Sequence, residues 1–257
     1  MKASISLLLL VLLCLIPAAN LFSQTADEVA HAPDGGIREH VDGIFIAPIA
    51  GAPFSAKVPV EITHQLQDGT TVTRKYYTLV ARDSQGRLYR ETRKLIAADE
   101  NREPPLIRTY VSDPQTGLRT VCSTAQRTCW TAKFHPVRRV SEAPVGPSKD
   151  DKSTLVRESL GSSTIDDLEV LGTRETRTFN AGAFGNDRPV AVTKEFWYSP
   201  RLQINLVVTR NDPRNGDQKI QVTDLSLADP DPTRFAPPQG YKMMDTQPAK
   251  SEEDAQP

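Results

Sequence analysis

Residues 202–216 read LQINLVVTRNDPRNG, and this stretch decides the fold class. Its first half has large apolar residues at every second position, the period of a strand with one buried face: Leu202, Ile204, Leu206 and Val208. Its second half, NDPRNG at 211–216, is rich in the Asn, Asp, Pro and Gly that favour tight reversals. The stretch therefore predicts a strand that turns back into a second strand over 217–225.

The same alternation of strand and reversal recurs along the chain in both directions. We expect further strands over 58–66, 70–81, 87–95, 106–112, 118–122, 128–134, 168–179 and 190–198, with the quoted strand over 201–210. Helical crossovers, which a parallel sheet needs, are not predicted. The fold class is therefore mainly β, as a single large curved antiparallel sheet (a half-barrel) with few helices; a β-sandwich or a closed barrel is the alternative.

Two local features refine this prediction. Pro59 interrupts the hydrogen-bonding capacity of the first strand, which indicates an edge strand or the start of a strand. Ser153–Leu160 is the main candidate for a helix. Residues 135–153 contain Pro136, Pro144 and Pro147 and are expected to form a Pro-rich break within the domain.

The two ends of the chain predict export and a division into four parts. Lys2, an apolar run from Ile5 to Ile16 and the small residues that follow have the order of a secretory signal peptide over 1–23. That run is shorter than the roughly 20 residues of a membrane-spanning helix. Cleavage is expected after Ser23, with Ala19 as the alternative. A flexible leader (24–53), in which 44–49 docks onto the domain, a β-rich domain (54–244) and a disordered acidic tail (245–257) follow.

The charges are unevenly distributed. Residues 57–139 contain fifteen Lys and Arg against eight Asp and Glu, whereas the rest of the chain contains sixteen against twenty-four. One interpretation is an ordinary solvated face, and the other is an anionic partner surface such as lipid, glycan or an envelope protein. Nucleic acid is not expected as a partner, because the protein is predicted to be exported and has no nucleic-acid motif.

The two cysteines that survive signal cleavage are expected to form a disulfide. Cys122 and Cys129 flank a short loop and can lie opposite one another on adjacent strands. Their spacing is not that of a Cys-x-x-Cys redox motif. In this arrangement Trp130 and Phe134 point to the other face of the sheet, toward the core.

Motifs for catalysis, metal binding or a cofactor are not found, and the protein is not expected to be an enzyme. The aromatic side chains offer the remaining candidate site. Either they pack in the core or some of them line an apolar groove on the concave face. The candidate ligand-binding residues are Trp130, Phe134, Phe196, Trp197 and Tyr198.

Several short stretches over residues 50–241 resemble a family of uncharacterised exported proteins of acidobacterial type. They are GAPFSA (51–56), RDSQGR (82–87), LG (160–161), LGTR (171–174), AGAFGNDRP (181–189), WYSP (197–200) and FAPPQGY (235–241). The order of strands and turns is also similar, more weakly, to the LolA/LolB-like half-barrel periplasmic carriers. That resemblance implies an antiparallel sheet with acyl chains held on its concave face, although the amphipathic lid helices of those carriers are not predicted here.

These observations lead to two hypotheses. The first is a periplasmic or otherwise extracytoplasmic β-rich protein that binds an apolar or amphiphilic ligand, such as a lipid or lipoprotein, on a curved sheet. The second is an envelope protein that binds another protein or has a structural role without a small ligand.

Overall fold

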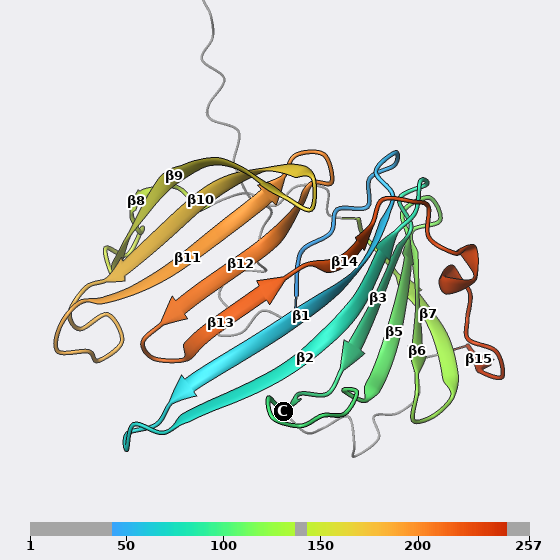
Figure 1. Cartoon of the computed structure of the whole chain (residues 1–257), viewed down its shortest axis with the longest axis horizontal. Coiled ribbons are helices and arrows are strands. Elements are labelled where there is room, and N and C mark those ends of the chain that lie inside the picture. Colours follow the sequence, from blue (N-terminus) through green and yellow to red (C-terminus); the bar gives the residue numbers. More distant parts are fainter. Residues whose placement is uncertain (1–42, 137–142, 246–257) are drawn as a thin grey trace, which may run out of the picture.

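A computed structural model describes residues 43–136 and 143–245 and shows one open, curved sheet of fifteen strands (Figure 1). The sheet fans out on both sides of a central strand and does not close into a barrel. The prediction of a single large antiparallel sheet is therefore confirmed, and the sandwich and closed-barrel alternatives are wrong. The predicted signal peptide, the first part of the leader and nearly all of the acidic tail lie outside the described residues.

In the order of their pairing, the main strands are β15 (Lys242–Met244), β7 (Thr128–Lys133), β6 (Leu118–Ser123), β5 (Leu106–Asp113), β3 (Leu88–Arg93), β2 (Thr71–Arg82), β1 (Phe54–Gln65), β13 (Gly216–Gln221), β12 (Ile204–Asp212), β11 (Val190–Ser199), β10 (Leu168–Phe179), β9 (Ser153–Ile165) and β8 (Gly146–Pro147). Two short strands lie off this path: β14 (Thr223–Ser226) pairs with β1, and β4 (Ile96–Ala97) pairs with β2. Among the strand pairings of residues 43–136 and 143–245, that of β15 with β7 is parallel and the others are antiparallel.

The first predicted strand is central rather than at an edge, which corrects the interpretation of Pro59. β1 pairs with β2 along its whole length on one side. On its other side it pairs with β14 at Ser55 and Lys57 and with β13 from Val60 onward. Pro59 lies between these two pairings and is directly opposed to no residue of β13 or β14, so a residue without an N–H fits there. A proline is tolerated in this central strand because its neighbouring strand changes there.

The helix prediction for Ser153–Leu160 is wrong, because these residues form the first part of β9. β9 pairs with β10 from end to end in an antiparallel hairpin, closed by Asp166 and Asp167 with positive φ angles of 47° and 59°. Asp tolerates this left-handed conformation better than most residues. Pairing with β10 over the whole strand outweighs the weak helical preference of the segment.

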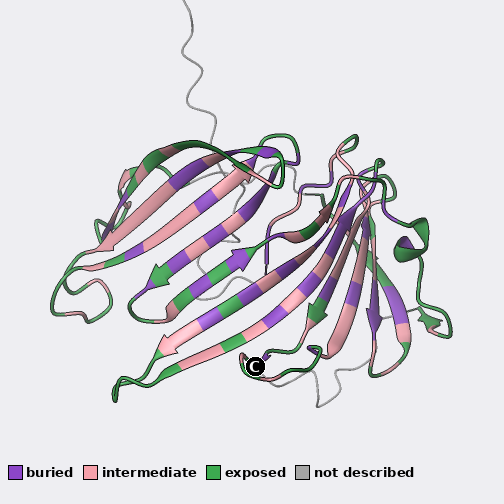
Figure 2. Ribbon diagram, in the orientation of Figure 1, coloured by how far each residue is buried: buried purple, intermediate pink, exposed green. Residues whose placement is uncertain are grey.

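A single apolar cluster lies on the central strands, where Figure 2 colours buried residues purple. Its members are buried residues of β1, β2, β10, β11, β12 and β13, together with Ile44 and residues of the connecting loops. A row of directly opposed residues shows how it forms: Phe196, Val208, Ile220, Val60 and Tyr76. We call the side of the sheet on which this row lies the core face.

Arg82 ties three separate segments together at one end of the core. Its side chain has no exposed area and donates to the backbone oxygens of Ala47 (2.9 Å), Ala52 (2.8 Å) and Leu202 (2.7 Å). β2 and the turn before β12 are three strands apart in the sheet, roughly 14 Å if the sheet were flat. A direct bond from Arg82 to Leu202 therefore requires strong curvature. The same bonds fix the segment around Ala47, next to Ile44, which is 6% exposed as expected for docking of 44–49.

The segment after β14, here called the strap, passes the turn between β2 and β3, where Asp229 accepts from the Ser84 amide at 2.9 Å, and ends in β15. It contains one turn of 3-10 helix, η1 (Pro232–Phe235), capped by Asp231, whose side chain accepts from the Thr233 amide at 2.8 Å. Phe235 is buried, and the Arg87 guanidinium lies 4.7 Å from its ring centre. This strap places β15 beside β7 at the edge of the sheet (Figure 1).

Candidate functional site

The four strands β3, β5, β6 and β7, here called the wing, continue the core face beyond the central strands. Register shows which of their side chains share that face. Val80 of the core lies opposite Arg90, which lies opposite Tyr110. The same row continues through Val121 to Trp130. Directly opposed residues of antiparallel strands point to the same side, so this face changes from aliphatic at the centre to arginine and aromatic on the wing.

The next row of the wing has the same character. It runs from Arg82 through Leu88 and Ser112 to Arg119 and Ala132. The half-buried Arg119 donates from Nε to the Ser112 hydroxyl at 2.9 Å, and its guanidinium lies 4.8 Å from the Phe134 ring centre. Burial lowers the pKa of Arg119, and the nearby positive charge of Arg90 lowers it further, against the opposing effect of Tyr110.

A third row on this face carries Arg108. It lies opposite Thr92 and Ser123, and its guanidinium is 6.0 Å from the Trp130 ring centre. Arginines thus recur on β2, β3, β5 and β6, and no Asp or Glu of β3, β5, β6 or β7 shares their face in this register. The core face of the wing is therefore a surface of arginine and aromatic side chains.

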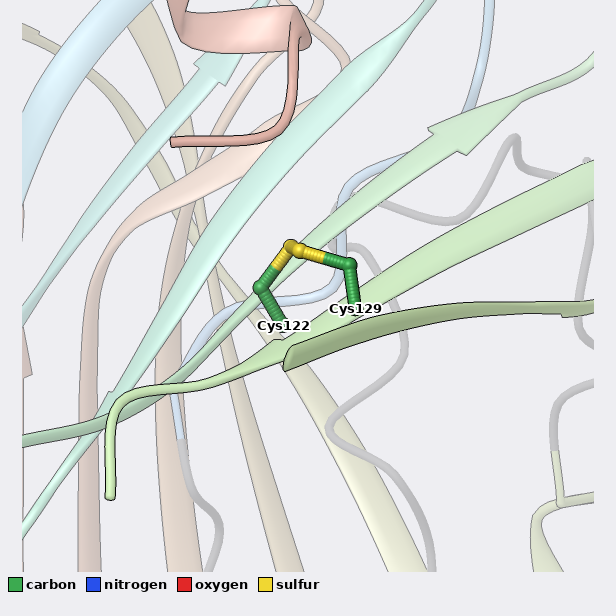
Figure 3. Close-up of a disulfide and its surroundings, with 2 residues drawn as sticks. All are labelled: Cys122 and Cys129. Atoms are coloured by element: carbon green, nitrogen blue, oxygen red, sulfur yellow. A yellow bond between two sulfur atoms is a disulfide. The ribbon is translucent and has the colours of Figure 1, made fainter. Parts of the chain in front are cut away.

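The predicted disulfide is confirmed and lies on the opposite face of the wing (Figure 3). Cys122 and Cys129 are directly opposed on β6 and β7, with their Cα atoms 4.0 Å apart. Both are buried. As expected from the alternation of side chains, Trp130 points to the core face. The disulfide therefore fixes the hairpin that presents Arg119 and Trp130 on the other side.

The five aromatic candidates do not form one site. Trp130 and Phe134 belong to the wing, whereas Phe196, Trp197 and Tyr198 are consecutive residues of β11, on the other side of β1. Trp130 is 5% exposed and Phe196 is 1% exposed, and Phe196 belongs to the apolar cluster. Phe134, Trp197 and Tyr198 are half-buried.

Trp197 has a packing role, because it lies against the apolar cluster that contains Phe196. It is directly opposed to Gly172 of β10. A Cβ atom at Gly172 would lie 2.8 Å from both the Trp197 ring and the Leu160 side chain. The indole therefore occupies the space that the glycine leaves.

A polar depression of about 400 Å³ lies on the face opposite to the core, across β11, β12, β13 and β1. The register places a row of alternating charge there, in which Glu61 faces Lys219, Lys219 faces Thr209 and Thr209 faces Glu195. Glu195 accepts from Arg174 Nε at 2.7 Å. None of the five aromatic candidates lines this depression.

The arginines of the wing were not singled out from the sequence, although the basic surplus of residues 57–139 was the signal that could have found them. A charge count does not say which face each residue takes. Arg90, Arg108 and Arg119 come from three strands, and only their register places them on one side.

The described residues contain no group of three or more His, Cys, Asp or Glu arranged to hold a metal ion. Over the same ranges, 43–136 and 143–245, no helix has the length and apolar character to cross a membrane.

No protein-family model matches the chain, and neither does any curated protein. Among solved structures the chain is similar to MucB, at 13% identity and a TM-score of 0.37, covering 75% of this chain and 59% of that one. It is also similar to LprF from Mycobacterium bovis, at 12% identity and a TM-score of 0.27, covering 71% of this chain and 90% of that one. A third similar structure is an outer membrane lipoprotein-sorting protein domain from Vibrio parahaemolyticus, at 10% identity and a TM-score of 0.26, covering 70% of this chain and 87% of that one.

The chain thus spans less than two thirds of the MucB chain. These neighbours are 10–13% identical to the chain and have TM-scores under 0.5, so none of the likenesses bears on what this protein binds. The resemblance to exported acidobacterial proteins is not tested by these comparisons and stays a prediction.

Proposed function

We propose that the protein is an exported, extracytoplasmic binding protein that holds an amphiphilic ligand on the core face of its open sheet. One observation carries the proposal: this face runs without interruption from aliphatic residues at the centre to arginine and aromatic residues on the wing. No catalytic activity is assigned to it.

The chemistry of the two parts matches the two parts of an amphiphile. Apolar area removed from water contributes roughly 25 cal/mol per Å², so an acyl chain gains most where aliphatic and aromatic side chains lie together. Tyr110 of β5 and Phe134, which follows β7, are half-buried, and Met244 of β15 is 43% exposed, so they retain surface that a ligand can cover. The buried Phe196 contributes to the core and not to ligand contact, whereas Trp197, which packs against the apolar cluster, and Tyr198 are half-buried and remain candidates.

The test is native mass spectrometry of the mature protein purified from the periplasm of a suitable host, with organic extraction of whatever co-purifies. A bound lipid or other amphiphile is the expected result. A ligand-free mass that does not change on incubation with envelope lipids would contradict the proposal. The same spectra give the first residue of the mature chain, which we expect to be Gln24.

A second candidate function is an envelope protein that binds another protein without a small ligand. The polar depression favours it, because carboxylate, ammonium, amide and hydroxyl groups alternate there over four strands. Interactions between exposed charges weaken as salt is raised. A partner captured on the mature protein at low salt, released at high salt and lost in Lys219→Glu, while ligand extraction finds nothing, would replace the first proposal with this one.

A further inference from the structure

Arg119 has donor groups that the fold does not use. Its Nε is satisfied by the Ser112 hydroxyl, a neutral partner. Within the described part of the chain, the two terminal nitrogens of Arg119 donate no hydrogen bond and form no ion pair. A guanidinium presents its donors as a rigid planar fork that matches the two oxygens of a carboxylate or phosphate. The fork of Arg119 is thus preorganised for an anion.

The surroundings of Arg119 increase its affinity for negative charge. Ser112 fixes the side chain from one side and the Phe134 ring packs against it from another, so little side-chain freedom remains to be lost on binding. Arg90 is close enough for its positive charge to act on Arg119. The residues directly opposite Arg119 on β5 and β7 are Ser112 and Ala132, neither of which carries a charge.

Apolar groups adjoin this cation on the same face. Two residues along β6 lies Val121, which faces Tyr110 on one side and Trp130 on the other. Trp130 in turn faces Met244 of β15, at the edge of the sheet. Val121 and Trp130 are buried, so the ends of this row, the half-buried Tyr110 and the exposed Met244, offer the surface that the apolar part of a ligand bound at Arg119 can cover.

We propose that Arg119, supported by Arg90, binds the anionic headgroup, a phosphate or carboxylate, of an acyl amphiphile whose chain lies along the row from Tyr110 to Met244. This inference rests on the proposed function and specifies its ligand. A free inorganic anion would meet the same guanidinium but would gain nothing from the apolar row, so the acyl chain is part of the assignment.

The test is calorimetric titration of the mature protein with three probes: dodecyl phosphate, dodecyl maltoside and inorganic phosphate. The two amphiphiles are kept below their critical micelle concentrations. Each is measured on the wild type, on Arg119→Gln and on Arg174→Gln. Arg174 is the matched control, because it is a half-exposed arginine on the other face that already pairs with Glu195. Thermal unfolding of both variants shows whether the fold is retained, and Arg119→Lys replaces Arg119→Gln if that variant does not fold.

We expect dodecyl phosphate to bind the wild type and Arg174→Gln equally, and Arg119→Gln at least about tenfold more weakly, the loss expected for a charge-assisted pair. Arg119→Lys keeps the charge without the fork and should also bind more weakly than the wild type. In the wild type, dodecyl maltoside and inorganic phosphate should each bind at least about tenfold more weakly than dodecyl phosphate.

Three outcomes would overturn the assignment. If the Arg119 variant binds dodecyl phosphate as the wild type does, or if dodecyl maltoside binds as tightly as dodecyl phosphate, the headgroup site is wrong while the proposed function stands. If inorganic phosphate binds as tightly as dodecyl phosphate, the site is a plain anion site. If neither amphiphile binds, the proposed function fails together with this inference.

Discussion

Replacing Arg82 should strongly destabilise the curved sheet. Arg82 is fully buried, and its guanidinium donates to three backbone oxygens from three segments. Burial lowers its pKa to about 10, so it stays charged at neutral pH. Its loss in Arg82→Met would leave the carbonyl oxygens of Ala47, Ala52 and Leu202 without these donors inside the protein.

The magnitude follows from opposing terms. A hydrogen bond from a charged donor contributes roughly 1.5–3 kcal/mol, so three bonds contribute about 5–9 kcal/mol. Removing the buried cation returns a desolvation penalty of several kcal/mol. The expected net loss for Arg82→Met is therefore about 3–5 kcal/mol. Arg82→Lys can reach fewer of the three oxygens and should lose about 2–3 kcal/mol.

Equilibrium unfolding in urea, followed by Trp fluorescence, measures this loss. With a slope of roughly 2–3 kcal/mol/M, the midpoint of Arg82→Met should fall by about 1–2 M. Arg102→Met is the control, because Arg102 forms an exposed pair with Glu100 and should change stability by less than about 0.5 kcal/mol. A loss for Arg82→Met no larger than that of the control would refute the reasoning that this arginine holds the curved sheet together.

Three further predictions concern local features. Replacing Cys122 and Cys129 with serine opens a small loop, so the free energy of unfolding should fall by about 2–3 kcal/mol with the fold retained; complete loss of folding would mean that the hairpin is more than a local element. For Asp212, burial alone would raise the pKa, but hydrogen bonds from its own loop lower it to about 2. A depressed carboxyl pKa stabilises the fold above pH 3.8, and this stabilisation, about 2 kcal/mol, is lost as the pH falls toward 2. In Asp212→Asn, the free energy of unfolding measured against pH should lack this loss below pH 3.8. A pH profile identical to that of the wild type would contradict the prediction. Gly216→Ala places a Cβ atom 2.2 Å from a backbone oxygen of β1, whereas Gly51→Ala meets nothing within 4 Å. Both have positive φ, so thermal unfolding should show a clearly larger loss at Gly216, and equal losses would exclude the steric clash as its cause.

The β class could be read from the sequence because its evidence is local. Alternation along 202–208 predicts a half-buried strand, and in the structure Leu206 and Val208 are buried as expected. Asn205 is also buried, because a bulge in β11–β12 pairing between Trp197 and Tyr198 changes the alternation there. The strand itself begins at Ile204 rather than 201, because the turn extends through Gln203, which has a positive φ of 54°.

Pairings between distant segments could not be predicted in the same way. Val60 faces Ile220 across β1 and β13, although 160 residues of chain separate them in the numbering. Alternation predicts which residues of one strand share a face, but it does not predict which strand lies next to that strand. For this reason the sequence predicts an edge strand or a strand start at Pro59, and a helix over Ser153–Leu160, whereas these residues lie in a central strand and in a strand that pairs with β10.

The features of the candidate site likewise divide into those that local sequence predicts and those that depend on pairing between distant strands. From sequence alone came the hairpin that joins Cys122 to Cys129, the orientation of Trp130 toward the core face and the basic character of the first half of the domain. The tertiary structure alone decided that Arg90 and Arg119 share one face and that the five aromatic candidates are divided between two regions. The physical reason is range: turns and side-chain alternation are set by neighbouring residues, whereas the order and curvature of strands depend on burial of the whole sheet.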